Sequence, residues 1–326
     1  MTIEDVFQLI EGDMDRVNSL IQDSLYSEVV LINQISQYII NSGGKRLRPI
    51  LVLLSANAFS YPSRENGEKD IILASVIEFI HTATLLHDDV VDESELRRGK
   101  DTANELWGNA ASVLVGDFLY SRAFEMMVGV GSMRVMEILS HSTNTIAEGE
   151  VLQLLNCNDA STTEERYLEV IHFKTAKLFE SASQLGAVIA EQDQATEQAM
   201  AKFGMHLGTA FQLIDDVLDY SASSEDMGKN VGDDLAEGKP TLPLIYAMQH
   251  GTKEQAEMIK DAIEHGGLEQ IEAITETIHT TGALKYTQEI AQKEARQAIA
   301  QLDHIPDSRY KQALITLANF SVERSF

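Results

Sequence analysis

The sequence predicts an all-α protein, and three observations lead to this fold class. Only five prolines occur among the 326 residues, and none lies between Pro62 and Pro240. That interval is rich in Ala, Leu, Glu, Gln and Met, which have high helix propensity. No segment shows the alternation of apolar and polar residues, bounded by turn pairs, that would indicate a β-sheet. We therefore expect helix after helix.

The helices can be placed in order along the chain. The N-terminal segment is acidic and amphipathic, and Pro49 can start the helix that follows "GGKRLRP". Later segments are apolar all round, as expected of helices that are enclosed by other helices. The expected helices cover residues 2–24, 28–41, 48–59, 69–92, 110–129, 131–156, 163–190, 195–221, 241–249, 253–264, 268–280, 283–302 and 308–321.

No low-complexity linker divides the chain. "YPSRENGEKD" (61–70) and "SASSEDMGKNVGDDLAEGKP" (221–240) are polar and contain glycine, so they are expected to be long loops. The length permits one domain or two. We interpret residues 1–326 as a single all-α domain.

The charge restricts the ligands that this chain can bind. With 25 basic and 51 acidic residues the formal net charge is −26. Such a charge repels nucleic acid and anionic membrane surfaces, so neither is expected as a partner. An anionic ligand must instead be held by a local basic cluster or by metal ions.

The expected location is the cytoplasm. Cys157 is the only cysteine, so no internal disulfide is possible, as in a reducing compartment. The acidic N-terminus does not resemble a signal or transit peptide. The longest apolar stretch, 71–87, contains Glu78 and His81 and is slightly short for a membrane span. It is expected to be a buried helix, and no integral membrane segment is expected.

Two aspartate motifs follow apolar residues. "DDVVD" directly follows the largely apolar segment "ATLLH", and "DDVLD" directly follows "FQLI". Residues four apart share a helix face, so several like charges crowd each turn, which is unfavourable unless a cation offsets them. The two motifs comprise Asp88, Asp89, Asp92, Asp215, Asp216 and Asp219.

Oxygen ligands of this kind suit a hard cation. Mg²⁺ takes one or two carboxylates and completes its shell with water and substrate phosphates, so two such turns facing each other would clamp a diphosphate. A solvated acidic helix end is the alternative for either motif alone. A calcium loop is less favoured, because the spacing lacks the alternating oxygen ligands and the glycine of an EF-hand.

Basic residues form short clusters that suit phosphate binding. In "GGKRLRP" (43–49) cations follow two glycines, and arginine can hold a phosphate with two parallel hydrogen bonds. In "ELRRGK" (95–100) cations follow the first acidic motif. Either cluster alone could be a surface loop of salt bridges. The clusters contain Lys45, Arg46, Arg48, Arg97, Arg98 and Lys100.

Further candidates lie near the second motif or within helices. Lys229 and Lys239 belong to a glycine-containing segment typical of a mobile loop that closes over a charged ligand. Lys174 and Thr175 lie mid-helix, where an ordinary exposed lysine is the alternative. Gln212 lies four residues before Asp216 on the same helix face. His81 lies seven residues before Asp88, two turns back.

The ordered set of motifs resembles the trans-polyprenyl diphosphate synthases. "GGKRLRP", "DDVVD", "RRG", "FKTAKL", "DDVLD" and "GKNVGDDLAEGKPTLP" occur in that family's order over nearly the whole chain. The resemblance implies a single-domain helical bundle of the isoprenoid synthase (prenyltransferase) type. It also implies a deep central cavity and a homodimer.

The resemblance also implies the role of each residue. The Mg²⁺ ligands would be Asp88, Asp89, Asp92, Asp215, Asp216 and Asp219, with several ions in each site. The allylic diphosphate would be bound by Arg97, Lys174, Thr175, Gln212, Lys229 and Lys239. Isopentenyl diphosphate would be bound by Lys45, Arg48, His81 and Arg98. The catalytic set would be Asp88, Asp89, Asp92, Lys174, Asp215 and Asp216.

The activity that the resemblance implies is chain elongation. An allylic primer, expected to be farnesyl diphosphate, would be extended by head-to-tail 1′-4 condensations with isopentenyl diphosphate to all-trans-octaprenyl diphosphate for a quinone side chain. Metal ions and lysines would stabilise the departing diphosphate.

Alternatives are a geranylgeranyl, heptaprenyl or nonaprenyl product, a terpene cyclase, a regulatory subunit or a helical scaffold. The intact "DDVLD" argues against a cyclase and against a regulatory subunit.

Small residues before the first motif suggest a long product. In this family, bulk at the fourth and fifth residues before the motif can block the tunnel, and here these are Thr84 and Ala83. Ile77 lies about 16 Å below Asp88, at a helical rise of roughly 1.5 Å per residue. Met126 and Met127 are expected at the tunnel floor, with plain core packing as the alternative.

Overall fold

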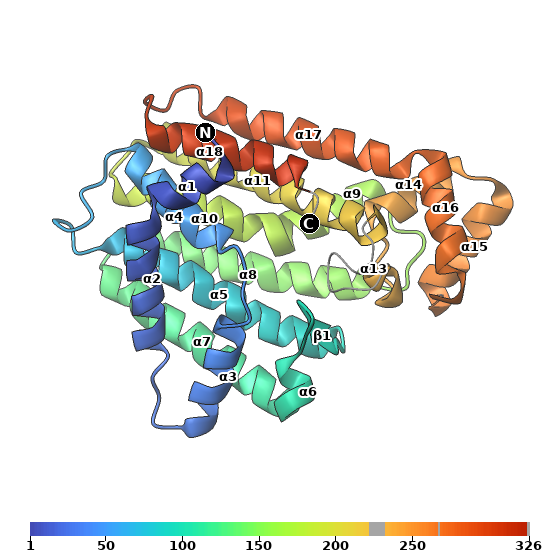
Figure 1. Ribbon diagram of the computed structural model, residues 1–326, viewed down its shortest axis with the longest axis horizontal. Coiled ribbons are helices and arrows are strands. Elements are labelled where there is room, and N and C mark those ends of the chain that lie inside the picture. Colours follow the sequence, from blue (N-terminus) through green and yellow to red (C-terminus); the bar gives the residue numbers. More distant parts are fainter. Residues whose placement is uncertain (222–231, 267, 325–326) are drawn as a thin grey trace. The chain divides into compact units, whose positions relative to one another are not determined.

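The computed structural model describes residues 1–221, 232–266 and 268–324, and its regular structure is almost entirely helical (Figure 1). The all-α prediction is therefore confirmed. The first half contains α1 (Ile3–Leu9), α2 (Glu11–Ser24), α3 (Val30–Ile40), α4 (Leu47–Ala58), α5 (Lys69–Val91), α6 (Ala103–Trp107), α7 (Asn109–Val130) and α8 (Met133–Asn156).

The second half continues with helices in the same manner. They are α9 (Glu164–Val170), the π-helical η1 (Ile171–Ala176), α10 (Lys177–Ile189), α11 (Gln194–Ser221), α13 (Asp233–Ala236), α14 (Leu242–His250), α15 (Lys253–His265), η2 (Leu268–Gln270), α16 (Ile271–Thr281), α17 (Ala283–Gln301) and α18 (Arg309–Glu323).

Most of the helices expected from the sequence are present, with two internal changes. The segment 2–24 divides at Ile10 into α1 and α2. The segment 163–190 contains a π-helical turn between α9 and α10. The short helices α6 and α13 were not expected, because four or five residues are too few to show a helical period.

One small hairpin interrupts the helices. β1 (Leu96–Arg97) pairs antiparallel with β2 (Lys100–Asp101). The turn residues Arg98 and Gly99 have φ angles of 54° and 72°, and two positive values in succession are typical of a type I′ turn. Strands of two residues are too short for the alternation that reveals a sheet in a sequence.

The chain forms two compact units, each assembled from separate segments. Unit 1 comprises Met1–Thr143, Leu178–Gly204 and Gln301–Leu317, and unit 2 comprises Asn144–Lys177, Met205–Ala300 and Ala318–Phe326. The expectation of a single domain stays a prediction.

In unit 1, α5 is the central helix. It packs mainly against α7, and also against α4 and α2. Its side chains Val76, Ile77, Phe79 and Ile80 are fully buried. This explains its composition: α5 is the one helix among the described residues long and apolar enough to cross a membrane, and 67% of its apolar window is buried inside the protein.

In unit 2, the end of α11 is fixed by an apolar cluster. Leu213 and Ile214 of α11 pack with Tyr167 of α9, Leu242 of α14 and Ala291 of α17. A second cluster joins α14, α15 and α16. The residues that follow Ile214 in α11 are therefore held on a rigid helix.

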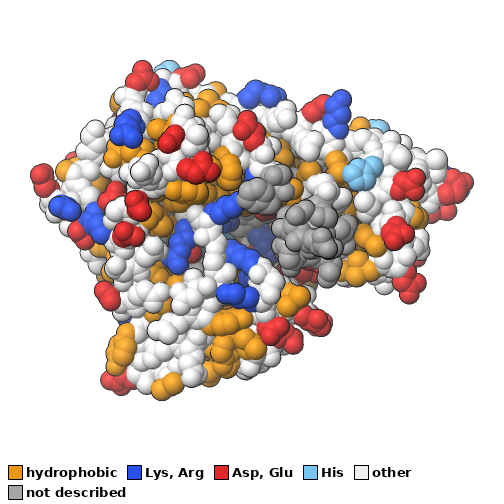
Figure 2. Space-filling view, viewed as in Figure 1, with side chains coloured by type: hydrophobic (Ala, Val, Ile, Leu, Met, Phe, Trp, Pro, Cys, Tyr) orange, Lys and Arg blue, Asp and Glu red, His pale blue; other side chains and the backbone are white. Residues whose placement is uncertain are grey.

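Acidic side chains lie at many separate places on the face of the molecule drawn in Figure 2. On the face drawn in Figure 2, acidic side chains are scattered rather than gathered into one patch. On this face the acidic side chains do not mark a single binding surface.

Candidate active site

The first acidic turn ends helix α5. Asp92 is the C-terminal cap of this helix, and its backbone N–H donates to the carbonyl of Asp88 at 2.8 Å. Asp88 and Asp92 are half-buried, whereas Asp89 is fully buried. The expected helical geometry, with Asp88 and Asp92 one turn apart, is present.

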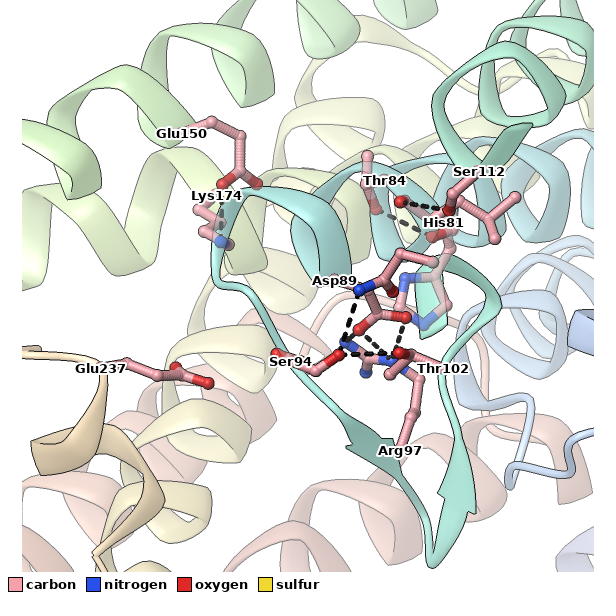
Figure 3. Close-up of polar contacts among 12 residues, drawn as sticks. His81, Thr84, Asp89, Ser94, Arg97, Thr102, Ser112, Glu150, Lys174 and Glu237 are labelled. Atoms are coloured by element: carbon pink, nitrogen blue, oxygen red, sulfur yellow. Dashed lines mark hydrogen bonds and ion pairs between the residues drawn. The ribbon is translucent and has the colours of Figure 1, made fainter. Parts of the chain in front are cut away.

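Arg97 binds the buried member of this turn. Its Nε donates to Asp89 Oδ1 at 2.8 Å and to Oδ2 at 3.1 Å, and its Nη2 donates to Oδ1 at 2.5 Å. Burial raises the pKa of Asp89, and the bond and charge of Arg97 act in the opposite direction. Arg97 lies on β1, so the hairpin brings the predicted diphosphate-binding arginine to the acidic turn (Figure 3).

Hydrogen bonds to the backbone hold the chain between these two residues. The N–H of Ser94 donates to the carbonyl of Asp89 at 2.9 Å. The carbonyl of Ser94 accepts bonds from Thr102 Oγ1 at 2.7 Å and from Asn104 Nδ2 at 3.2 Å. These contacts connect both ends of the hairpin segment, as Figure 3 shows for Ser94 and Thr102.

Two of the predicted isopentenyl diphosphate residues are in direct contact. Arg48 Nη1 lies 3.1 Å from His81 Nε2, and the Arg48 guanidinium lies 4.4 Å from the centre of the Phe179 ring. Because arginine only donates, His81 must accept through Nε2 and keep its proton on Nδ1. Burial, and then the charges of Arg48, Arg97 and Arg98, hold the pKa of His81 well below its ordinary value.

Gly43 and Gly44, before Lys45, both lie against Arg98, and Gly44 leaves space for it. Arg98 Nη1 donates to the carbonyl of Gly43. At Gly44, a Cβ atom would lie 2.7 Å from Arg98 Nη1, and the φ angle is +134°. A larger residue at Gly44 would strain the backbone and would displace the Arg98 guanidinium from its present position. Lys45 itself is exposed.

Glu78 is a charged neighbour of this basic cluster that the sequence did not reveal as a candidate. Burial raises the pKa of Glu78, and the charges of Arg46, Arg48 and Arg98 lower it. It lies on α5 three residues before His81, on the same helix face. This spacing was the available signal, but the apolar residues around Glu78 obscured it.

The predicted chain-length residues have different surroundings. Ile77, Ala83 and Met127 are fully buried. Thr84 and Met126 are half-buried, and Thr84 Oγ1 donates to the carbonyl of His81 at 2.8 Å. The tunnel remains a prediction. A surface hollow of unit 1 is lined by other residues, namely Met1, Asp5, Gln8, Leu9 and Arg309.

The second acidic turn ends helix α11 and contains a bonded chain of polar groups. Tyr167 OH donates to Asp216 Oδ2, and Gln212 Nε2 donates to Asp216 Oδ1 at 2.8 Å. Thr175 Oγ1 donates in turn to Gln212 Oε1 at 3.3 Å. Burial, and then the charge of Asp234, raise the pKa of Asp216 well above its ordinary value.

The other two aspartates of this turn are also held. The carbonyl of Asp219 accepts from the N–H of Gly232 at 3.1 Å, and Asp219 Oδ2 accepts from the N–H of Asp234 at 3.4 Å. Asp215 is 41% exposed and forms an ion pair of 2.7 Å with Arg324. Tyr167, Asp234 and Arg324 were not predicted, because no local sequence pattern links them to residues 215–219.

Lys174 lies in the π-helical turn η1 and faces a carboxylate. Its Nζ is 2.6 Å from Glu150 Oε2 (Figure 3). The helices approach closely here, since a Cβ atom at Gly149 would lie 2.7 Å from the backbone nitrogen of Lys174. π-Helical turns are frequent at functional sites, because they shift side chains out of the regular helical register.

Of the two lysines predicted in the loop after the second motif, the structure describes one. Lys239 forms an ion pair with Glu237. Lys229 lies outside the described residues. The first acidic turn and the isopentenyl diphosphate residues belong to unit 1, whereas the second turn, Lys174 and Lys239 belong to unit 2. The facing arrangement of the two turns stays a prediction.

The donor set matches a hard cation that keeps water ligands. Among the described residues, no three or more His, Cys, Asp or Glu side chains form a ready metal cage. Mg²⁺ does not require one, because one or two carboxylates with waters and phosphates complete its octahedron. Burial, and then the charge of Asp234, raise the pKa of Asp216, and a divalent cation near this turn would favour its charged form.

Comparisons with known proteins show the family of the chain. A family profile, polyprenyl synthetase, matches residues 29–280, and the chain belongs to this family. The chain is 53% identical to octaprenyl diphosphate synthase of Escherichia coli K12, over 99% of both chains. It is 50% identical to the same enzyme of Haemophilus influenzae, over 100% of this chain and 98% of the relative.

A solved structure has the same fold. Polyprenyl synthase of Caulobacter crescentus, complexed with calcium and isoprenyl diphosphate, aligns with a TM-score of 0.95 and 44% identity, covering 100% of this chain and 98% of that one. The predicted family, helical fold and chain-elongating prenyltransferase activity of the octaprenyl type are confirmed by these full-length matches.

The contact between Arg48 and His81 predicts how stability depends on pH. Below about pH 6.5 an unfolded histidine takes up a proton that folded His81 resists, so acid favours unfolding. We expect His81→Gln, which keeps an acceptor for Arg48, to flatten the fall in unfolding free energy between pH 7 and pH 5. The slope removed is at most about 1.4 kcal/mol per pH unit. Thermal unfolding at several pH values measures it.

The exposed His304 offers a matched control. His304→Gln should leave the slope unchanged. An equal slope in His81→Gln and in the unmodified protein would contradict the assignment of a neutral, arginine-bound imidazole.

Proposed function

We propose that this protein extends farnesyl diphosphate by successive 1′-4 condensations with isopentenyl diphosphate and makes all-trans-octaprenyl diphosphate for a quinone side chain. The observation that carries the proposal is a set of cations already bound to carboxylates or bases. Arg97 is bound to Asp89, Lys174 to Glu150, and Arg48 to His81. Cations arranged before the substrate arrives cost little reorganisation during the reaction.

Mg²⁺ is the proposed cofactor, and it would stabilise the negative charge that develops on the departing diphosphate. Asp88, Asp92 and Asp215 are the carboxylates of the two turns that are not fully enclosed. We expect these three to be direct ligands. The buried members of each turn would act by holding neighbouring groups, as Asp89 holds Arg97 and as Asp216 is held by Tyr167 and Gln212.

The diphosphate groups of the two substrates would take separate sets of cations. The allylic diphosphate would be bound by Arg97, Lys174, Lys229 and Lys239, with Thr175 and Gln212 beside them. Isopentenyl diphosphate would be bound by Lys45, Arg48 and Arg98 beside neutral His81. Arginine suits this role because its planar fork can bind two phosphate oxygens at once.

The reaction would proceed in three steps: release of the diphosphate, formation of the new carbon–carbon bond, and loss of a proton. Lys174 would exchange Glu150 for diphosphate oxygens. Arg97, held in place by Asp89, would bind the leaving group through its remaining N–H groups as the bond to carbon breaks. The electron pair of the isopentenyl double bond attacks the allylic carbocation. A proton would then leave the new chain, with the released diphosphate as the proposed base. The product is again allylic, so the cycle can repeat.

The enzyme is proposed to work in the cytoplasm as a homodimer. Exposed apolar side chains on α7 and at the start of α8 support self-association: Leu114, Val128 and Met133 are 65%, 66% and 74% exposed. In unit 2, Val151, Leu154 and Leu155 of α8 are also exposed. Burial of such side chains is the main source of association free energy.

Product analysis tests the proposed function. The protein is incubated with labelled isopentenyl diphosphate, farnesyl diphosphate and Mg²⁺, and the dephosphorylated products are sized by chromatography. We expect an eight-unit chain, and no product when Mg²⁺ is removed with a chelator. A cyclic terpene, or no incorporation of label, would show that the proposal is wrong.

The position of Ala83 predicts control of product length. Ala83→Tyr should shorten the product to a short-chain prenyl diphosphate, because the ring would block the tunnel. If Ala83 instead lay in plain core, overpacking would lower the unfolding free energy by about 1–3 kcal/mol without a new product length. Leu106→Tyr, on α6 at a position 46% exposed, is the control and should leave the length unchanged.

The apolar face of α7 predicts the oligomeric state. Leu114→Glu should convert the dimer to a monomer, because a charge buried without a partner opposes association. Light scattering coupled to size-exclusion chromatography measures the mass. Leu268→Glu, at a position 48% exposed outside α7 and α8, is the matched control and should remain dimeric. A dimeric Leu114→Glu variant would assign the interface elsewhere.

A further inference from the structure

The second strand of the small hairpin is bonded to helix α3 through Tyr38. Tyr38 OH donates to the backbone carbonyl of Asp101 in β2 at 2.7 Å, across 63 residues of sequence. Because the acceptor is a backbone carbonyl, this bond fixes the course of the strand and does not depend on the Asp101 side chain. Burial, and then the charge of Asp101, raise the pKa of Tyr38, so its hydroxyl keeps the proton that it donates.

Aromatic packing holds the Tyr38 side chain in this orientation. Its ring meets the ring of Trp107 edge to face, with centroids 5.2 Å apart and an interplanar angle of 71°. Such a geometry is favoured for aromatic pairs. Trp107 ends α6, and α6 packs against both α3 and α7. The Tyr38 hydroxyl is therefore placed by packing as well as by its own hydrogen bond.

The chain after α3 contacts the same hairpin at its turn, where Arg98 Nη1 donates to the carbonyl of Gly43. The segment 38–43 therefore holds the hairpin at two places, Asp101 in the second strand and Arg98 in the turn. A single contact would allow the hairpin to pivot, whereas two contacts fix its orientation against the end of α3. The same segment runs into "GGKRLRP", the cluster predicted to bind isopentenyl diphosphate.

The two arginines of the hairpin depend on this attachment to different degrees. Arg97 Nε donates to both oxygens of Asp89 on α5, so its position is fixed without α3. Arg98 lies in the exposed turn and is bonded to Gly43. Loss of the Tyr38 bond should therefore disturb Arg98 more than Arg97.

We propose that Tyr38 is a positioning residue for isopentenyl diphosphate binding, because its hydroxyl fixes the hairpin so that Arg98 stays against the glycines that precede Lys45. The inference rests on the proposed function, in which Arg98 binds isopentenyl diphosphate. Tyr38 lies outside the set of residues predicted to bind either diphosphate. It acts through Arg98.

Steady-state kinetics on the full chain test the inference. Tyr38→Phe keeps the ring and removes only the hydroxyl. We expect the KM for isopentenyl diphosphate to rise about threefold to tenfold, the range that corresponds to one lost hydrogen bond. The KM for farnesyl diphosphate and kcat should stay unchanged, because Arg97 keeps its bonds to Asp89. An equal rise of both KM values, or no rise for isopentenyl diphosphate, would overturn the proposal.

Tyr26→Phe is the matched control. It removes the same hydroxyl from a tyrosine of unit 1 that is 71% exposed. Both KM values should equal those of the unmodified protein. A rise as large as that in Tyr38→Phe would show that the effect is not specific to the hairpin, which would also contradict the proposal.

A double-mutant cycle identifies the residue through which Tyr38 acts. Arg98→Gln alone should raise the KM for isopentenyl diphosphate more than Tyr38→Phe does. Adding Tyr38→Phe to Arg98→Gln should then have no further effect, since the positioned group is already absent. Additive effects of the two substitutions would mean that Tyr38 acts independently of Arg98, and the inference would be wrong.

Failure of the proposed function and failure of the inference give different results. If Arg98→Gln left the KM for isopentenyl diphosphate unchanged, the assignment of Arg98 to this substrate would fail, and the inference with it. If Arg98→Gln raised this KM and Tyr38→Phe did not, only the inference about Tyr38 would fail.

Discussion

The rest of the site depends on one electrostatic constraint: three aspartates crowd the end of a largely apolar helix, and this happens twice. Like charges in so little water are unfavourable, and each must be bonded or neutralised. The protein meets this requirement within each unit. Arg97 binds Asp89 in unit 1, and Tyr167, Gln212 and Arg324 bind the second turn in unit 2. The carboxylates of the two turns that are not fully buried are Asp88, Asp92 and Asp215.

The basic groups of the site are also bonded to polar or charged partners. Lys174 is held by Glu150, and Lys239 by Glu237, so each cation has a carboxylate partner. Burial and the neighbouring arginines lower the pKa of His81 and favour its neutral form. The neutral ring can accept a hydrogen bond from Arg48, whereas a protonated ring would repel the guanidinium. In the proposed function a diphosphate would meet side chains that are already held in place, which reduces the cost of ordering them.

Glycines contribute by permitting close approach rather than by flexibility. Gly149 lets α8 lie against the turn that carries Lys174, and Gly44 leaves space for Arg98. The π-helical turn has a related effect, because it shifts Lys174 and Thr175 from the register of a regular helix. Small local departures from regular structure thus place the predicted substrate-binding side chains.

The sequence by itself determined the helices and the chemistry of the motifs. Helix propensity and residue spacing act over a few residues, so α5, α11 and the grouping of Asp88 with Asp92 could be read directly from the chain. Only the tertiary structure decided which partners these groups have. Tyr167 is 49 residues from Asp216, and Glu150 and Arg324 are likewise distant in sequence from the residues they bind. Such contacts depend on how helices pack, and no local pattern encodes them.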